Sequence, residues 1–267
     1  MCTLLNDTLA NCIGSQIQER FLTSFTRPLL IETSNMSAYE CQRFITNPLS
    51  YVRDVCINVQ TCGRRGVGAF NANLSYAHCW FDLVPWSTSL FGGASQVMLE
   101  PTAVLGAGLI QGYYVPYISY GNVVSTSADH IAPVLLDGVP RTLPPNSFVF
   151  TGGQNGCSLL MMNGSTPNTL SFLHYPNSDG KQQHYPILAQ VGKTEADIIL
   201  SIDFDIYGEP ENPNACSFFL YNGTEWVAVT QPQVQGAINE TWWRRSMSIN
   251  RNMRPRYFKT SGGGVIP

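Results

Sequence analysis

The residues best suited to chemistry in this sequence are a thiol and an imidazole that flank one turn. Cys157 opens the apolar segment 157–162, and His174 lies near the end of the apolar segment 169–175. The six residues between these segments, Asn-Gly-Ser-Thr-Pro-Asn, are rich in turn formers. Two apolar segments separated by such a cluster predict a β-hairpin.

The register of this hairpin decides whether the two side chains meet. If all six residues form the loop, Met162 faces Thr169 and Cys157 faces His174. Directly opposed residues on antiparallel strands point to the same face, with Cβ atoms about 4.5–5.5 Å apart. An imidazolium beside a thiol lowers the thiol pKa from about 8.5 towards neutrality. The pattern fits thiolate chemistry, although a buried cysteine next to a histidine also fits core packing.

A glycine-rich stretch leads into this cysteine. Residues 151–156, Thr-Gly-Gly-Gln-Asn-Gly, bring the chain to Cys157 with no bulky side chain directly before it. Gly156 can adopt a positive φ and lets a substrate carbonyl approach the backbone. We therefore predict that amides around Gly156, Cys157 and Ser158 point at a developing oxyanion.

This stretch resembles the core of the cysteine glutamine deamidases. The shared pattern is Thr-x-x-x-x-Gly-Cys, a hydrophobic strand, a turn and Leu-x-Phe-x-His-Tyr-Pro, over about thirty residues of this chain. The superfamily includes the chemotaxis deamidase CheD, the catalytic domain of cytotoxic necrotizing factor and Burkholderia lethal factor. The resemblance implies Cys157 as nucleophile, His174 as base and Thr151 as the supporting third member.

The same resemblance implies a protein-glutamine deamidase that works through an acyl-thioester, releases ammonia and needs no metal or organic cofactor. It also implies a bacterial toxin or effector that acts in the host cytosol on a protein such as a Rho-type GTPase or a translation factor. We expect the partner to be a protein that presents a glutamine. We expect no nucleic-acid partner, no membrane span and a monomer.

Two alternatives stay open. A transglutaminase or a cysteine protease can use the same Cys–His pair, because all three chemistries pass through an acyl-thioester. A non-enzymatic β-sandwich binding or adhesion module fits the low charge and the Trp242-Trp243 pair, whose rings can stack on sugars or dock on a partner.

The composition favours a turn-rich β protein. Charged residues make up 12% of the chain, about half the usual share, while hydrophobic residues make up 44%. The charge is uneven, because residues 240–267 carry six basic side chains and one acidic one. A basic segment of this kind can bind an acidic partner or remain a solvated tail.

The cysteines and the apolar segments indicate a soluble protein with reduced thiols. The eight cysteines include no Cys-x-x-Cys pair and are too sparse for a disulfide-stapled domain. The first residues lack the basic start and apolar core of a signal peptide. The most apolar run, 103–110, is far too short to span a bilayer.

Helical patterns gather before residue 62. We predict one helix over 16–26 and another that follows a capping box formed by Ser37 and Glu40. The second helix is expected to end near Asn47-Pro48, and a further piece to run through 51–59.

Strand patterns dominate from about residue 66 onward. Asn222-Gly223, between two apolar runs, is the strongest hairpin signal. Asp203 and Asp205 alternate with apolar residues, so we predict that both carboxylates face one side of a strand, as a polar face or a cation site. His78 and Cys79 are adjacent and cannot easily cooperate. The predicted strands near the candidate residues are 76–84, 95–99, 103–110, 112–120, 131–136, 187–191, 198–206, 217–221 and 225–230.

These elements predict an α+β fold in which mixed β-sheets form a sandwich-like core with flanking helices. We expect a single deamidase-like domain over 1–267. It comprises a helical N-terminal subregion (1–65), a β-rich catalytic body (66–240) and a basic C-terminal tail (241–267).

Overall fold

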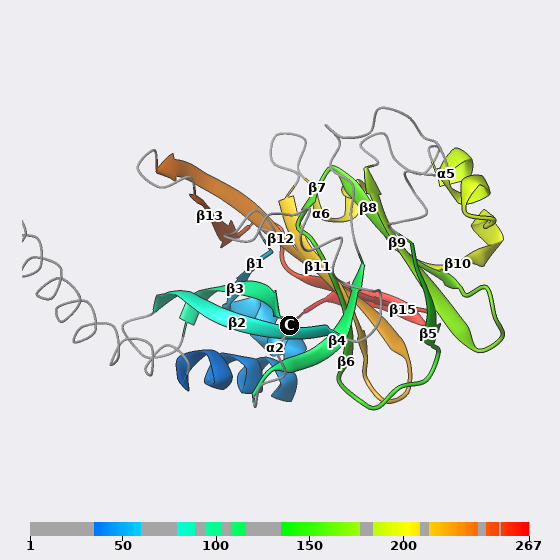
Figure 1. Ribbon diagram of the computed structural model, residues 1–267. Coiled ribbons are helices and arrows are strands. Elements are labelled where there is room, and N and C mark those ends of the chain that lie inside the picture. Colours follow the sequence, from blue (N-terminus) through cyan, green and yellow to red (C-terminus); the bar gives the residue numbers. More distant parts are fainter. Residues whose placement is uncertain are drawn as a thin grey trace, which may run out of the picture.

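Strands account for most of the structure, and helices are few. The computed structural model describes residues 35–59, 79–88, 94–102, 108–115, 135–176, 184–208, 214–239, 244–250 and 252–266. Within these residues, eleven strands form one sheet and four form a second (Figure 1). The prediction of a mostly β chain with helices near its start is confirmed at this level.

The larger sheet is mixed. Its order is β1-β3-β2-β4-β6-β11-β12-β14-β15, with β7 beside β11 and β13 beside β12. β1 pairs parallel with β3 and β4 pairs parallel with β6, while the other pairs are antiparallel. The strands are β1 (Cys56–Asn58), β2 (Cys79–Thr88), β3 (Ala94–Thr102), β4 (Ile110–Val115), β6 (Ser147–Thr151), β7 (Gln154–Asn155), β11 (Asn214–Tyr221), β12 (Trp226–Asn239), β13 (Arg244–Ile249), β14 (Arg256–Lys259) and β15 (Gly262–Val265).

The smaller sheet is antiparallel, in the order β10-β8-β9-β5. Its centre is the predicted hairpin, formed by β8 (Cys157–Asn163) and β9 (Thr169–Pro176). β5 (Leu135–Pro140) and β10 (Ile198–Ile202) flank the hairpin.

Alternating side chains on these strands build three hydrophobic clusters. Phe218 of β11 points to a cluster that the helix over residues 35–46 and α2 (Pro48–Asp54) cover, whereas Phe219 points to a cluster shared with the smaller sheet. The outer face of the smaller sheet packs against Ile187 and Leu188 of α5 (His184–Gln190). In Figure 1 the blue helices and α5 accordingly lie at opposite ends of the molecule.

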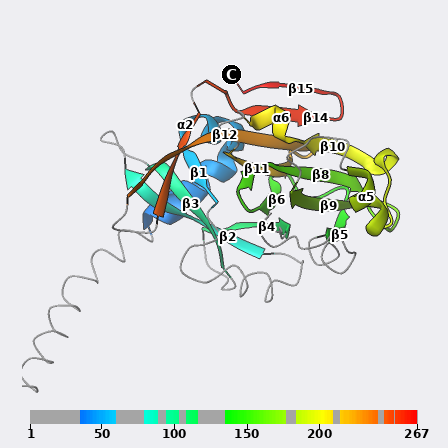
Figure 2. The same cartoon turned by 90° about the horizontal axis from the view of Figure 1, so that it is seen from above.

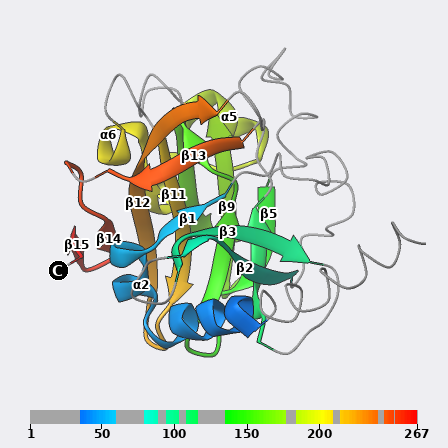
Figure 3. The same cartoon turned by 90° about the vertical axis from the view of Figure 1, so that its left-hand side faces the viewer.

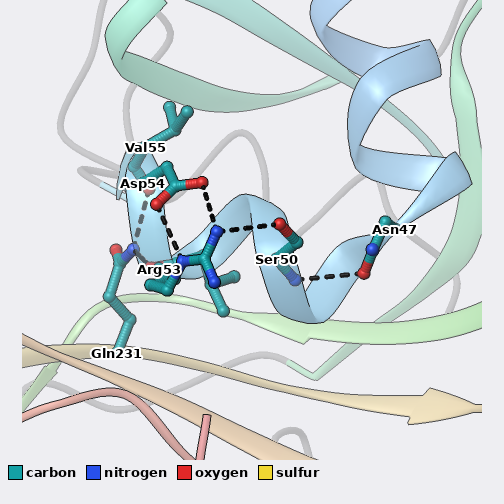
Figure 4. A network of polar contacts seen from close by, with 7 residues as sticks. Asn47, Ser50, Arg53, Asp54, Val55 and Gln231 are labelled. Carbon is teal, nitrogen blue, oxygen red and sulfur yellow. Dashed lines mark hydrogen bonds and ion pairs between the residues drawn. The ribbon is translucent and has the colours of Figure 1, made fainter. Parts of the chain in front are cut away.

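Buried glutamine side chains attach α2 to the larger sheet. Asn47 caps α2, because its Oδ1 accepts the Ser50 amide at 3.1 Å. Gln231 of β12 donates from Nε2 to the carbonyls of Val52 and Val55. Figure 4 shows Gln231 beside Val55, and its Oε1 accepts the amide of Ile57. One side chain therefore satisfies three backbone groups where α2 gives way to β1.

The predicted capping box is wrong. Ser37 and Glu40 both lie inside the helix over 35–46, and the Ser37 hydroxyl donates to Asp82. Glu40 is fully buried and accepts from Tyr51 and Arg43. These tertiary partners take the place of a local cap.

The other helix predictions met mixed outcomes. The helix over 35–46 ends before Asn47, as predicted, but residues 51–59 divide between α2 and β1. The helix predicted over 16–26 lies outside the described residues.

Two predicted strands of the C-terminal half are wrong in part or whole. Residues 187–191 belong largely to α5, because Ile187, Leu188 and Val191 recur at helical spacing and pack on the smaller sheet. The strand over 198–206 ends at Ile202 and gives way to the short helix α6 (Phe204–Tyr207). A 3-10 turn, η4 (Glu195–Asp197), precedes β10.

The remaining strand predictions, with one exception, agree with the structure where it describes them. β2, β3, β4, β5, β11 and β12 overlap their predicted ranges, although residues 76–78, 103–107 and 116–134 lie outside the described part. The strand predicted over 103–110 is wrong where it is described, because Gly108 lies in a turn with a φ of 82° and only Ile110 belongs to a strand, β4. The Asn222-Gly223 hairpin is confirmed: Tyr221 pairs with Trp226, and Gly223 has a φ of 100°.

The described C-terminal residues belong to the larger sheet. β13 and β14 both pair with β12, and β15 pairs with β14 (Figure 3). The segment predicted as a basic tail thus supplies three strands, while Trp242 and Trp243 lie outside the described residues. In the part of the chain that the structure describes, no helix has the length and apolarity needed to cross a membrane.

Candidate active site

A β-bulge aligns two polar side chains ahead of the cysteine. β6 and β7 both pair with β11, at Phe150↔Phe218 and at Gln154↔Ala215. Three residues of the β6–β7 segment therefore span two residues of β11, which is a one-residue bulge. The extra residue puts Thr151 and Gln154 on the same face of the sheet, towards the smaller sheet. The predicted glycine-rich turn is thus a bulge within a continuing strand.

Gly156 is the corner at which the chain leaves the larger sheet for the smaller one. Its φ is 69°, a left-handed value that favours glycine. β7 ends at Asn155 in the larger sheet, and β8 begins at Cys157 in the smaller sheet. The corner therefore sets Cys157 at the edge of the space between the sheets. Figure 1 shows β7, α6 and the start of β8 close together.

The hairpin register differs from the prediction by two positions. Cys157 pairs with Pro176, and His174 pairs with Leu159. A shift of two keeps every side chain on its face, so Cys157 and His174 still share the inner face of the smaller sheet. They are diagonal neighbours, which lie roughly 7–8 Å apart at Cα and remain within reach of a long side chain.

The turn explains the shift. The Thr169 amide donates to the Thr166 carbonyl at 3.3 Å, and Asn168 adopts a φ of 61°. Pro167 suits the second position of such a tight turn. Because the turn lies towards the C-terminal end of the cluster, Asn163 joins β8 and pairs with Leu170.

A hydrogen bond between the sheets orients the imidazole. Thr151 Oγ1 lies 2.6 Å from His174 Nδ1 and donates to the Val115 carbonyl at 2.8 Å. A hydroxyl has one proton and a carbonyl only accepts, so the imidazole must donate through Nδ1–H. Nε2 then carries the lone pair of a base.

Tyr207 of α6 fixes the backbone of the cysteine. Its hydroxyl accepts the Cys157 amide at 2.8 Å and donates to the Cys157 carbonyl at 2.6 Å. β10 has no residue paired beyond Leu159, since Ile202 is its last residue. The hydroxyl therefore occupies the place of a neighbouring strand beside Cys157.

Asp203 anchors the segment that carries Tyr207. It is buried and accepts from the hydroxyls of Ser158 and Ser201 at 2.8 and 2.5 Å. The predicted shared strand face of Asp203 and Asp205 is wrong, because β10 ends before both residues and Asp205 is exposed on α6.

The predicted oxyanion amides are largely engaged within the protein. Cys157 donates its amide to Tyr207. Gly164 donates to the Thr169 carbonyl, and hydrogen-bonded pairs alternate along an antiparallel ladder, so the Ser158 amide belongs to the β8–β9 ladder. The Gly156 backbone also hydrogen-bonds the Tyr207 hydroxyl, so an oxyanion would have to displace Tyr207 to reach these amides.

Burial keeps the thiol and the imidazole neutral. Burial raises the pKa of the Cys157 thiol, although a backbone hydrogen bond at Asn155 opposes the shift. Burial also lowers the pKa of His174 to about 3. The expected fall in the thiol pKa is therefore absent from this resting arrangement. Cys157 shares its raised pKa with the buried thiols of Cys41, Cys56, Cys79 and Cys216.

Two residues beside Cys157 had no specific signal in the sequence. Tyr207 directly follows residues 198–206, which the alternation of polar and apolar side chains predicted to be a strand. Gln154 lies in the glycine-rich stretch that was predicted to be a turn. Gln154 is 1% exposed, and its Nε2 donates to the Cys157 carbonyl at 3.3 Å. His78 and His130 lie outside the described residues.

The described residues contain no group of three His, Cys, Asp or Glu side chains placed to hold a metal ion. The sequence matches no known family model and no curated protein.

Proposed function

We propose that this protein is a cysteine hydrolase that deamidates glutamine side chains of a protein substrate. The observation that carries this proposal is the contact of Thr151 with His174, which orients the imidazole on the sheet face that also holds Cys157. The fold proposed with it is a sandwich-like α+β core with flanking helices, in which the site lies at one end of the space between the sheets.

The proposed reaction begins from a neutral pair. His174 Nε2 takes the thiol proton as Cys157 Sγ attacks the carboxamide carbon, and the carbonyl oxygen becomes an oxyanion. The imidazolium returns the proton to the leaving nitrogen, so ammonia departs and a thioester remains. His174 then accepts a proton from water, whose hydroxide attacks the thioester. The products are glutamate and the restored thiol.

The proposed setting is a bacterial toxin or effector that modifies a host protein, such as a Rho-type GTPase or a translation factor, in the host cytosol. The deamidase resemblance of residues 151–176 is the basis for this setting. The proposed catalytic set is Cys157, His174 and Thr151, with the Gly156–Ser158 backbone near the oxyanion.

A direct test uses purified protein and a eukaryotic cytosolic extract. Site-resolved mass spectrometry should detect glutamine-to-glutamate conversion with the wild-type chain and none with Cys157→Ala or His174→Ala. Cys216→Ala is the matched control, because Cys216 is also a buried free thiol but faces the other side of β11. Equal conversion by the wild type and Cys157→Ala contradicts the proposal.

The rival acyl-thioester chemistries separate in the same assay. Added methylamine that becomes attached to substrate glutamines identifies a transglutaminase, and new peptide ends identify a protease. The position of Cys157 at the start of a strand favours the deamidase, because papain-like proteases place their cysteine at the start of a helix.

One observation favours a non-enzymatic binding module instead. A raised thiol pKa and a buried, neutral imidazole are also what structural side chains in a core have. Site-resolved alkylation with iodoacetamide at about neutral pH decides between the two. An enzyme should label Cys157 faster than Cys41 or Cys56, and His174→Ala should remove that difference.

A further inference from the structure

The amide oxygen of Gln154 has no hydrogen-bond partner among the described residues. The side chain is almost fully buried, with 1% exposed, so solvent does not satisfy this oxygen freely. A buried acceptor without a partner costs free energy, and such groups in native proteins call for a specific explanation.

The orientation of this amide is fixed. Nε2 is the atom that faces the Cys157 carbonyl at 3.3 Å, because a carbonyl needs a donor. Oε1 is bonded to the same carbon as Nε2, so it also lies beside the nucleophile. Gln154 is held there by β11, through its pairing with Ala215, and by the bulge that turns it inward.

Gln154 thus places an acceptor oxygen beside Cys157 that can accept a hydrogen bond from an N–H. Thr151 Oγ1 is engaged by His174 and Val115, and the Tyr207 hydroxyl is engaged by the Cys157 backbone. Among Thr151, Tyr207 and Gln154, Gln154 is the one that presents an acceptor for which the described residues offer no partner.

We propose that Gln154 Oε1 accepts a hydrogen bond from the NH2 group of the substrate carboxamide and so determines specificity for a primary amide. This inference rests on the proposed function and names its specificity residue. An ester has no such N–H and leaves Oε1 unpaired. A carboxylate product brings negative charge against the Oε1 lone pairs, which favours its release. A site built to hydrogen-bond an N–H discriminates strongly against analogues that lack it.

The test compares two alkylating probes of Cys157. Iodoacetamide carries a primary carboxamide, and methyl iodoacetate is a neutral ester without an N–H. Site-resolved mass spectrometry gives the alkylation rate of Cys157 with each probe, and the ratio of the two rates, corrected for their ratio on free cysteine, measures carboxamide recognition. Gln154→Met should lower this ratio about tenfold, the factor that one hydrogen bond supplies.

Two further variants make the result specific. Gln190→Met is the matched control, because Gln190 Oε1 also lacks a partner among the described residues but lies on α5. It should leave the ratio unchanged. Gln154→Glu, protonated in this buried site, retains an acceptor oxygen and a donor to Cys157 and should keep most of the preference, even if Gln154→Met folds poorly.

The outcomes separate the two proposals. A wild-type ratio near that of free cysteine, or one unchanged in Gln154→Met, overturns the role of Gln154 and leaves the deamidase standing. If Cys157 reacts no faster than Cys41 and Cys56 with either probe, the proposed function fails, and the role of Gln154 fails with it.

Discussion

At the scale of the residue, a threonine directs the imidazole of His174. A carboxylate in that position would stabilise the imidazolium by charge, whereas the Thr151 hydroxyl only fixes the tautomer. Together with the low pKa of His174, this makes the protonated ring unstable in the resting site. In the proposed reaction, such an imidazolium would pass its proton readily to the leaving nitrogen.

The depressed pKa of His174 predicts a loss of stability in mild acid. The folded state holds His174 neutral down to about pH 3, while the unfolded chain binds the proton near 6.5. Between these values the unfolded state binds more protons, so stability falls as the pH falls, by at most about 1.4 kcal/mol per pH unit. From neutral pH to about pH 4.5, urea unfolding should show the wild type losing about 2–3 kcal/mol more than His174→Gln. Parallel pH curves for the two proteins would contradict this.

The sequence predicted part of the residue geometry. Cys157 and His174 lie on the same face of the sheet because side chains alternate along a strand, and a register shift of two residues does not change that face. The exact pairing did not follow, because it depends on where Pro167 and Asn168 place the turn. Tyr207 and Gln154 were missed, since each reaches Cys157 through strands that pair far apart in sequence.

At the scale of the element, the corner at Gly156 places the nucleophile. A residue with a Cβ at a φ of 69° is strained by about 1–2 kcal/mol. Gly156→Ala should therefore lower both the unfolding free energy and the alkylation rate of Cys157. Gly138→Ala is the control, because Gly138 has a φ of 79° and open space for a Cβ but lies in β5.

The two glycine variants should differ in one respect only. Both should unfold at lower urea concentration, and only Gly156→Ala should slow the labelling of Cys157. Equal labelling rates in the two variants would mean that the corner does not set the position of the thiol.

Local patterns predicted the elements unevenly. Asn222-Gly223 gave a correct hairpin because its turn chemistry is local. The bulge at 151–153 and the switch from β10 to α6 could not be predicted, because both depend on pairing with β11 and on the burial of Asp203 and Tyr207.

At the scale of the molecule, Gln231 links the helical layer to the strands. Gln231→Leu leaves two carbonyls and one amide without this partner in a buried region. The unfolding free energy should fall by at least about 2 kcal/mol. Gln42→Leu is the control, because Gln42 is exposed and its side chain donates to Thr46 within its own helix, so its effect should stay within about 0.5 kcal/mol. Urea unfolding of both variants measures the difference, and equal losses would contradict it.

Composition and strand patterns predicted a mostly β molecule, but they could not predict the order of the strands in the sheets. β1 pairs with β3 although β2 separates them in the sequence, and β6 lies between β4 and β11. Figure 2 shows how the late strands β14 and β15 lie along the outer side of β12. Such contacts join segments that are far apart in the sequence, and no local pattern in either segment predicts its partner.

The hydrogen bond between the two sheets has a kinetic consequence. The β8–β9 hairpin forms from neighbouring residues, but Val115, Thr151 and Tyr207 reach it only through contacts of long sequence separation, which form slowly. A refolding chain therefore gains its secondary structure while the imidazole still lacks its oriented tautomer. The oriented arrangement of Thr151, His174 and Tyr207 around Cys157 should thus appear last in refolding, after the secondary structure has formed.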